Sequence, residues 1–266
     1  MNTSPVHSIS SSPDVGHAPR PTLARTFRGV WRLTYPAHLA PGALLSNAGL
    51  LALLGLLAIP SVRHGEADEF LSWATNFFLC TLVPAIAFLA GAGALRDEMK
   101  PVAVDYLHTR PARRDVVGAC KCVAQYLALQ PALVLALAVV VGAGVWRGVP
   151  SALAAAPALL AAQLLTTAAF LGLGAFIGAL TPRYLVFGLL YAAVVEIGIG
   201  AIPTQLSRLS LTQHTRTIVA ALDGSDAAAT ALGSSLVLGT VAIVGTLLAA
   251  ALLRHREMVG AAARDN

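Results

Sequence analysis

Residues 232–253 read LGSSLVLGTVAIVGTLLAAALL, an uncharged run of mostly apolar residues. About 20 such residues are enough for a helix to cross the hydrocarbon core of a bilayer, so this run predicts a membrane-spanning helix. Similar runs occur earlier, and the candidate spans are 38–60, 70–95, 119–146, 152–181, 184–203 and 232–253. The chain has no strand-like alternation long enough for a membrane barrel. We therefore expect an all-α polytopic membrane protein with about six transmembrane helices.

The composition favours the same class. Hydrophobic residues make up 56 % of the 266-residue chain and charged residues 12 %, whereas an ordinary soluble domain is about 25 % charged. So few charges leave too little polar surface to cover a water-soluble globule of this length. The formal net charge is +5, but the basic residues lie between apolar runs and form no continuous basic face with interleaved aromatics. We therefore expect the lipid bilayer, and no nucleic acid, as a partner.

Four regions follow from these patterns. Residues 1–20 are rich in Ser, Pro and His and predict a disordered cytoplasmic tail. Residues 21–37 are basic and aromatic and predict an interfacial amphipathic segment on the membrane surface. Residues 38–258 form the predicted six-span transmembrane domain, and residues 259–266 form a second cytoplasmic tail.

The Lys and Arg residues predict the orientation of these spans. Cytoplasmic segments carry an excess of Lys and Arg. With both ends of the chain inside, 14 of the 18 Lys and Arg residues fall in cytoplasmic segments. These are Arg20, Arg25, Arg28, Arg32, Arg96, Lys100, Arg110, Arg113, Arg114, Lys121, Arg183, Arg254, Arg256 and Arg264. The outer loops would hold Arg63, Arg147, Arg208 and Arg216. We therefore expect an N-in and C-in topology.

The cytoplasmic segment between the second and third spans reads RDEMKPVAVDYLHTRPARRDVVGACK at residues 96–121. Pro101 suits the first position of a helix, and Pro111 disfavours helix at the residue before it. Val102 and Tyr106, one helical turn apart, share an apolar face with Ala103 and Leu107. The pattern predicts a short amphipathic helix parallel to the membrane. This helix could be an anchor among lipid headgroups or a lever that a cytoplasmic partner moves.

This segment also resembles the cytoplasmic loop of ABC-2 type transporter permeases. Residues at matching spacing are Glu98, Leu107, Thr109, Arg110, Pro111, Arg114 and Lys121, whereas Val102 and Ala103 replace a frequent Gly-Thr pair. The wider resemblance covers most of residues 21–258, including an outer segment after span five that dips back towards the membrane in the family. It implies a coupling helix that contacts a separate ATP-binding cassette ATPase. The implied coupling residues are Glu98, Val102, Tyr106, Leu107, Thr109, Arg110, Pro111, Arg114 and Lys121.

The resemblance further implies a homodimer or a heterodimer with another permease, in the plasma (inner) membrane of a prokaryote. The chain itself has only two lysines, Lys100 and Lys121, and neither lies in a phosphate-binding GxxxxGK[ST] motif. We therefore expect no catalytic residue, metal or cofactor in this chain, and ATP and Mg²⁺ in the partner.

Glu196 is the only carboxylate deep within a predicted span. Because a charge at the bilayer centre is costly, it should face protein or water, or be protonated. It is a candidate for the translocation path or outer gate, or it could bond to a neighbouring loop near the outer interface. Gly174 and Gly178 form a GxxxG pattern that predicts close helix packing, within the chain or between subunits. The alternatives to a permease are a proton-coupled secondary transporter using Glu196, a non-transporting membrane scaffold subunit, and an intramembrane enzyme.

Overall fold

The computed structural model describes residues 22–61, 66–98, 113–200, 205–221 and 227–262. In these ranges all regular secondary structure is helical, which confirms the all-α prediction. The helices, in chain order, are α1 (Leu23–His38), α2 (Pro41–Ser61), α3 (Ala67–Trp73), η1 (Ala74–Leu82), α4 (Val83–Glu98), α6 (Arg114–Trp146), α7 (Ala152–Leu180), α8 (Tyr184–Tyr191), η2 (Ala192–Ile199), η3 (Gln205–Leu209), α9 (Leu211–Ala220) and α10 (Ala227–Ala262).

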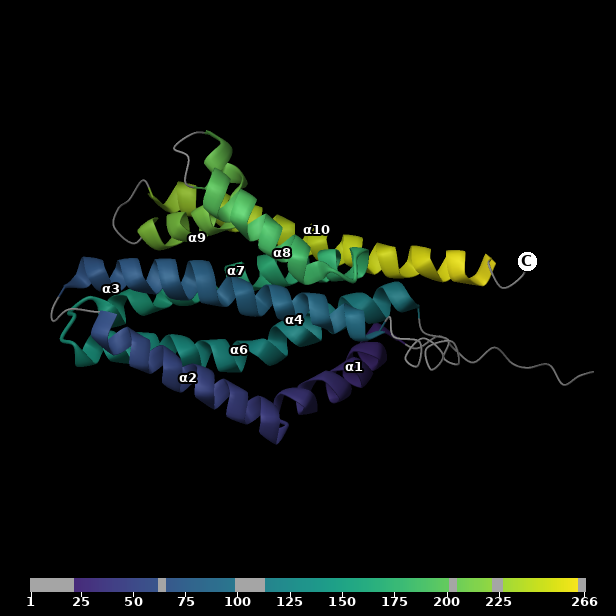
Figure 1. Cartoon of the computed structure of the whole chain (residues 1–266), viewed down its shortest axis with the longest axis horizontal. Coiled ribbons are helices and arrows are strands. Elements are labelled where there is room, and N and C mark those ends of the chain that lie inside the picture. The colour runs from purple at the N-terminus through teal and green to yellow at the C-terminus, as the bar shows by residue number, and fades with distance from the viewer. Residues whose placement is uncertain (1–21, 62–65, 99–112, 201–204, 222–226, 263–266) are drawn as a thin grey trace, which may run out of the picture.

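The long helices lie along one axis, with α7 in contact with both α4 and α10 (Figure 1). Helix α6 packs against α2, α4, α7 and α10. Helix α1 and the C-terminal end of α10 lie at the same end of the bundle (Figure 1). We call this the basic end, because Arg25, Arg96, Arg114 and Arg254 belong to the helix ends gathered there.

Five helical stretches are long and apolar enough to cross a membrane: Pro41–Pro60, Ala67–Arg96, Arg114–Trp146, Ala152–Leu180 and Ala228–His255. The fifth predicted span, 184–203, corresponds to a shorter apolar helix, Tyr184–Ile199. At 1.5 Å per residue its 16 residues cover about 24 Å, less than the ~30 Å of a hydrocarbon core. The sixth crossing and the orientation therefore stay predictions.

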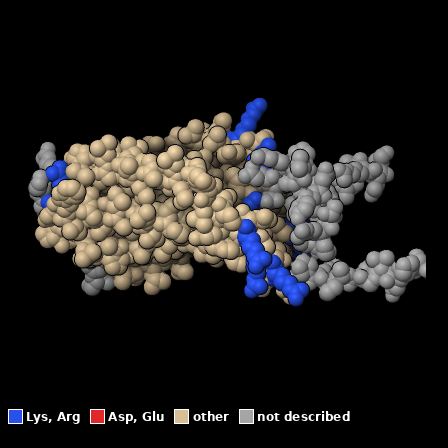
Figure 2. All heavy atoms as spheres, turned by 90° about the horizontal axis from the view of Figure 1, so that it is seen from below, with Lys and Arg blue, Asp and Glu red and all other residues tan. Residues whose placement is uncertain are grey.

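The surface charges agree with insertion into a bilayer. On the face drawn in Figure 2, the Lys and Arg side chains gather towards the two ends, and a band without them separates these groups. Large apolar side chains of the apolar helices are exposed, among them Leu56, Leu189, Leu236 and Leu247. Lipid accepts such a surface, whereas water does not.

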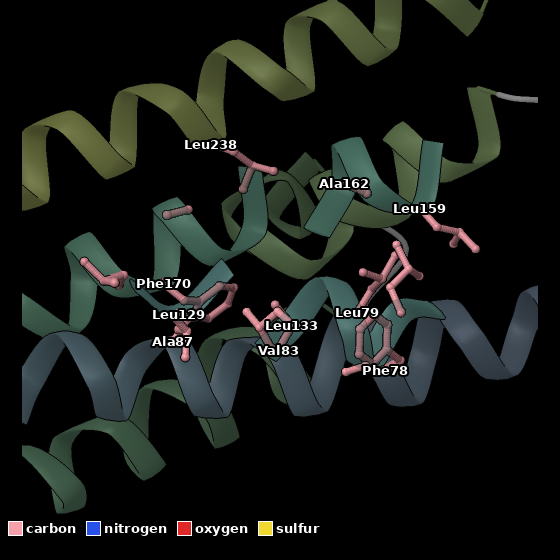
Figure 3. Close-up of a cluster of buried hydrophobic side chains, with 14 of the residues drawn as sticks. Phe78, Leu79, Val83, Ala87, Leu129, Leu133, Leu159, Ala162, Phe170 and Leu238 are labelled. Carbon is pink, nitrogen blue, oxygen red and sulfur yellow. The ribbon is translucent and has the colours of Figure 1, made fainter. Parts of the chain in front are cut away.

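The centre of the bundle is a cluster of apolar side chains from several helices (Figure 3). Phe78 and Val83 come from η1 and α4, Leu133 from α6, Leu159 from α7 and Leu238 from α10, and all are buried. Leu238 is the only one of the labelled residues from α10, whereas α7 contributes Leu159, Ala162 and Phe170. Helix α7 therefore forms the middle of the core.

Glycines allow α7 to approach its two neighbours closely. A Cβ atom built on Gly174 would lie 2.2 Å from the carbonyl oxygen of Phe88 in α4, and one on Gly178 would lie 2.6 Å from that of Ala92. On the other side of α7, a Cβ on Gly172 would lie 2.6 Å from the carbonyl oxygen of Ala242 in α10. Without side chains at these positions the backbones meet directly, as small-residue motifs allow in membranes.

The N-terminal helix α1 packs along α6. Its aromatic residues Phe27, Trp31 and Tyr35 stack in series, with ring centroids 6.2 Å and 4.9 Å apart. At its end, His38 Nε2 lies 3.4 Å from Gln125 Oε1 of α6. The basic residues Arg25, Arg28 and Arg32 are exposed. The segment predicted at 21–37 is thus a helix with one packed and one basic face, and its place at the membrane surface stays a prediction.

Of the two predicted tails, only the C-terminal one overlaps the described residues. The tail at 1–20 lies outside them. Helix α10 continues to Ala262, so the first four residues of the tail predicted at 259–266 are helical.

Candidate functional site

Most of the predicted coupling residues lie outside the described residues: Val102, Tyr106, Leu107, Thr109, Arg110 and Pro111. The flanking ones are placed by helix ends. Glu98 is the last residue of α4, Arg114 is the first residue of α6, and Lys121 follows in the second turn of α6. The two helix ends that flank residues 99–112 therefore lie at the basic end.

The start of α6 is held by a local set of bonds to Asp115. Arg113 donates to this carboxylate from Nη2 at 2.6 Å and from Nε at 3.2 Å. The N–H of Val116 also donates to Asp115 Oδ1, at 2.9 Å. A carboxylate in the first turn of a helix is favoured by the helix dipole. These contacts define where α6 begins, immediately after the predicted coupling segment.

Glu196, in η2, lies in a cradle of hydrogen-bond donors at the opposite end of the bundle. Oε1 accepts from the Tyr191 hydroxyl at 2.6 Å and from the Leu211 N–H at 3.1 Å. Oε2 accepts from the Ser210 hydroxyl at 2.6 Å, and from the Thr212 hydroxyl and N–H at 2.7 Å and 3.0 Å. Five donors thus converge on one carboxyl group. We call Tyr191, Glu196, Ser210, Leu211 and Thr212 the carboxylate clasp.

The clasp forms because Glu196 meets the N-terminus of α9. The first N–H groups of a helix have no partner within the helix, and the helix dipole favours an anion beside them. Ser210 is the N-cap of α9, and its hydroxyl oxygen accepts from the N–H of Gln213 at 3.2 Å. Glu196 accepts from the N–H groups of Leu211 and Thr212, the first two residues of α9. These bonds hold the end of η2 against α9.

Further polar contacts attach α9 to the bundle. The hydroxyls of Thr215 in α9 and Thr166 in α7 lie 2.7 Å apart and are buried. The Cys80 thiol of η1 donates to the carbonyl oxygen of Thr212 at 3.7 Å. Both π-helical segments, η1 and η2, contact α9. Hydrogen bonds therefore join α9 to η2, to α7 and to η1, and α9 also packs against α10.

Analysis of the sequence selected Glu196 but missed Tyr191, Ser210 and Thr212. One signal was present: Ser210 and Gln213 match the S-x-x-Q pattern of a capping box, which marks a helix start. That pattern locates the free N–H groups. It does not reveal which anion will meet them, because Glu196 is 14 residues earlier.

Gly174 and Gly178 lie at the contact between α7 and α4 and are buried there. The GxxxG pattern left open whether these glycines pack within the chain or between subunits. In the described residues they pack within the chain, against α4. Gly91 of α4 lies at the same contact with α7, because a Cβ built on it would lie 2.2 Å from the carbonyl oxygen of Leu171.

Gln163 of α7 is 0 % exposed, and its side-chain amide has no hydrogen-bond partner among the described residues. An unpaired buried polar group costs about 1–3 kcal/mol. We expect Gln163→Met to increase the free energy of unfolding by about 1–2 kcal/mol, because it keeps the side-chain length and removes the polar atoms. An unfolding titration with SDS from a mild detergent measures this, with Leu164→Met as the control. A loss of stability in Gln163→Met would show that the amide is bonded in the folded protein.

Within the described residues, no group of three or more His, Cys, Asp or Glu side chains is arranged to hold a metal ion. Cys80, Cys120 and Cys122 are free thiols. The carboxylate clasp uses both of its oxygens for protein hydrogen bonds. Its arrangement can hold two helices together, and it presents no open ligand position.

The described residues thus form an all-helical bundle of the kind found in membranes. At one end of it, a hydrogen-bonded carboxylate joins η2 to α9. No family model matches its sequence, and no curated protein is found to be similar to it.

Proposed function

We propose that this chain is the membrane-spanning permease subunit of an ATP-driven transporter of the ABC-2 type. In this proposal it forms the translocation path, and a separate ATP-binding cassette subunit hydrolyses ATP with Mg²⁺. Two permease chains, identical or different, enclose the path in the plasma membrane of a prokaryote. The observation that carries the proposal is the resemblance of residues 96–121 to the family's coupling loop.

The helices beside this segment support the proposal mechanically. The segment leaves from α4, and α4 contacts α7 through glycines without intervening side chains. Helix α7 meets α10 in the same way, since a Cβ on Gly245 would lie 2.6 Å from the carbonyl carbon of Gly172. Packed backbones of this kind transmit displacement rather than absorb it. A push on residues 99–112 would therefore move α4, α7 and α10 together.

The carboxylate clasp bears on the rival proposal of a proton-coupled transporter. A proton carrier must alternate between protonated and ionised states. Glu196 has five donors around it, so both of its oxygens already accept hydrogen bonds from the protein. We therefore propose that Glu196 supports the outer end of the permease by fixing α9.

The coupling proposal is tested by association with the ATPase. The full chain is purified from its native membrane with a mild detergent, and copurifying proteins are identified by mass spectrometry. We expect an ATPase with a GxxxxGK[ST] motif among these proteins. We expect Leu107→Asp or Arg110→Glu to reduce its recovery at least tenfold, because the first places a charge at an apolar position of the contact and the second reverses a charge there. A tenfold loss corresponds to about 1.4 kcal/mol.

Arg208→Glu is the control for this experiment, because Arg208 is an exposed residue of η3 at the other end of the bundle. Its ATPase recovery should equal that of the unmodified chain. Full recovery with Leu107→Asp and Arg110→Glu would contradict the coupling assignment. Absence of any such ATPase from the unmodified preparation would contradict the proposed function itself.

A further inference from the structure

An apolar crevice of about 360 Å³ lies between the C-terminal end of α7 and the helix formed by α8 and η2. Ile177 and Leu180 line it from α7, Phe187 and Leu190 from α8, and Val194 and Val195 from η2. Its volume is within the ~300–1,000 Å³ range of small-molecule sites. The other lining residues are Thr181 and Tyr191.

The two polar side chains of the lining turn their oxygens to partners in the protein. The Tyr191 hydroxyl donates to Glu196 at 2.6 Å, so the crevice meets its ring. Thr181 Oγ1 accepts from the N–H of Arg183 at 3.2 Å. A polar ligand would therefore lose hydrogen bonds to water and gain few from these walls, which is unfavourable. The lining selects a hydrocarbon.

The position of the crevice matches one leaflet of a bilayer. Helix α7 ends and α8 begins at the basic end of the bundle (Figure 1). From Phe187 to Val195 a helix rises about 12 Å at 1.5 Å per residue. Half of a hydrocarbon core of roughly 30 Å is about 15 Å. The crevice thus runs from near the basic end towards the middle of the membrane.

A cation lies close to the lining of the crevice in sequence. Arg183 occupies the turn between α7 and α8, two residues after the lining residue Thr181, and its side chain is exposed. Basic residues at this depth attract the phosphate of anionic lipids, by about 1 kcal/mol each. An apolar groove with an exposed cation in the adjoining turn between α7 and α8 suits the acyl chain and the phosphate of a phospholipid.

We propose that this crevice binds one acyl chain of a phospholipid from the leaflet at the basic end, with the lipid phosphate beside Arg183. The binding is tighter than that of the surrounding lipids, because the chain contacts α7 on one side and α8–η2 on the other. This site requires only that the protein is in a membrane, and it does not depend on an ATPase partner.

Photo-crosslinking tests the site. The full chain is reconstituted in vesicles of phosphatidylcholine containing a few per cent of phosphatidylglycerol with a diazirine in its acyl tail, and labelled peptides are mapped by mass spectrometry. We expect labelling to concentrate on peptides that contain Leu180 and Leu190. Leu190→Trp should fill the crevice and lower this labelling at least fivefold.

Leu189→Trp is the matched control, because Leu189 neighbours Leu190, is 73 % exposed and lies outside the lining. It should leave the labelling unchanged. Arg183→Gln should keep the labelling pattern but reduce the preference for phosphatidylglycerol over a phosphatidylcholine probe. Equal labelling of both tryptophan variants would overturn the proposal, since it indicates ordinary surface lipid. A disulfide between two chains at Leu190→Cys would also overturn it, because a second copy would then cover the crevice.

Discussion

A Gly174→Ala protein should be less stable than the unmodified chain by about 2–3 kcal/mol, and a Gly174→Leu protein should fail to fold. The added Cβ would lie 2.2 Å from the carbonyl oxygen of Phe88 and 2.9 Å from its Cα. These are backbone atoms of α4, so no side chain can rotate away. Forcing extra atoms into a packed core costs about 1–3 kcal/mol and sometimes more. Unfolding with SDS from a mild detergent measures the difference.

Gly93→Ala is the control for this prediction. Gly93 lies in α4, and nothing is within 4 Å of the position of its Cβ. Alanine is a better helix former than glycine by up to ~1 kcal/mol, so Gly93→Ala should be neutral or stabilising. If the Gly174→Ala and Gly93→Ala proteins proved equally stable, this result would contradict the direct backbone contact of α4 with α7 at Gly174. Under the proposed function, that contact is also what transmits motion from the coupling segment.

Replacing Glu196 should detach α9 from η2. In Glu196→Gln one carboxylate oxygen becomes an NH₂ group, which would face the N–H of Leu211 or of Thr212. Two donors then meet, and one acceptor for the start of α9 is lost. A hydrogen bond within a protein contributes about 0.5–1.5 kcal/mol to stability. Because Glu196 is only half-buried, we expect a loss of about 2–3 kcal/mol for the whole set, below the sum of its bonds.

Two further variants define this effect. Tyr191→Phe removes one donor and should cost about 1 kcal/mol. Glu66→Gln should have no measurable effect, because Glu66 is exposed and makes no side-chain capping bond at the start of α3. Faster proteolysis around residues 205–221 in Glu196→Gln would accompany the loss of stability. A Glu196→Gln protein with full stability but no transport would instead indicate a carrier or gate, and would contradict a supporting role for the clasp.

The long uncharged runs predicted membrane-spanning helices well, because the requirement for about 20 apolar residues depends on neighbouring residues alone. The predicted span 152–181 differs from α7 by one residue at its end. The predicted span 184–203 corresponds to a shorter described helix, which ends at Ile199, and Glu196 bonds to α9 near that end.

The candidate site was predicted in part. Glu196 was identifiable because a lone carboxylate among apolar residues needs a partner. Its donors were not identifiable, since they come from Tyr191 on the same helix and from residues 210–212 after an intervening segment. The GxxxG pattern indicated close packing at Gly174 and Gly178. It contained no information on whether α4, α10 or another subunit would be the neighbour.

The sequence alone determined that this chain is helical and belongs in a membrane, because hydropathy and helix length are properties of consecutive residues. Only the tertiary structure decided that α7 lies between α4 and α10, that Glu196 bonds to the start of α9, and that an apolar crevice lies beside α8. Each of these depends on the direction in which a side chain, or a missing side chain, faces another helix. Such directions are set when the helices pack together, because the sum of many weak contacts decides which packing is the most stable.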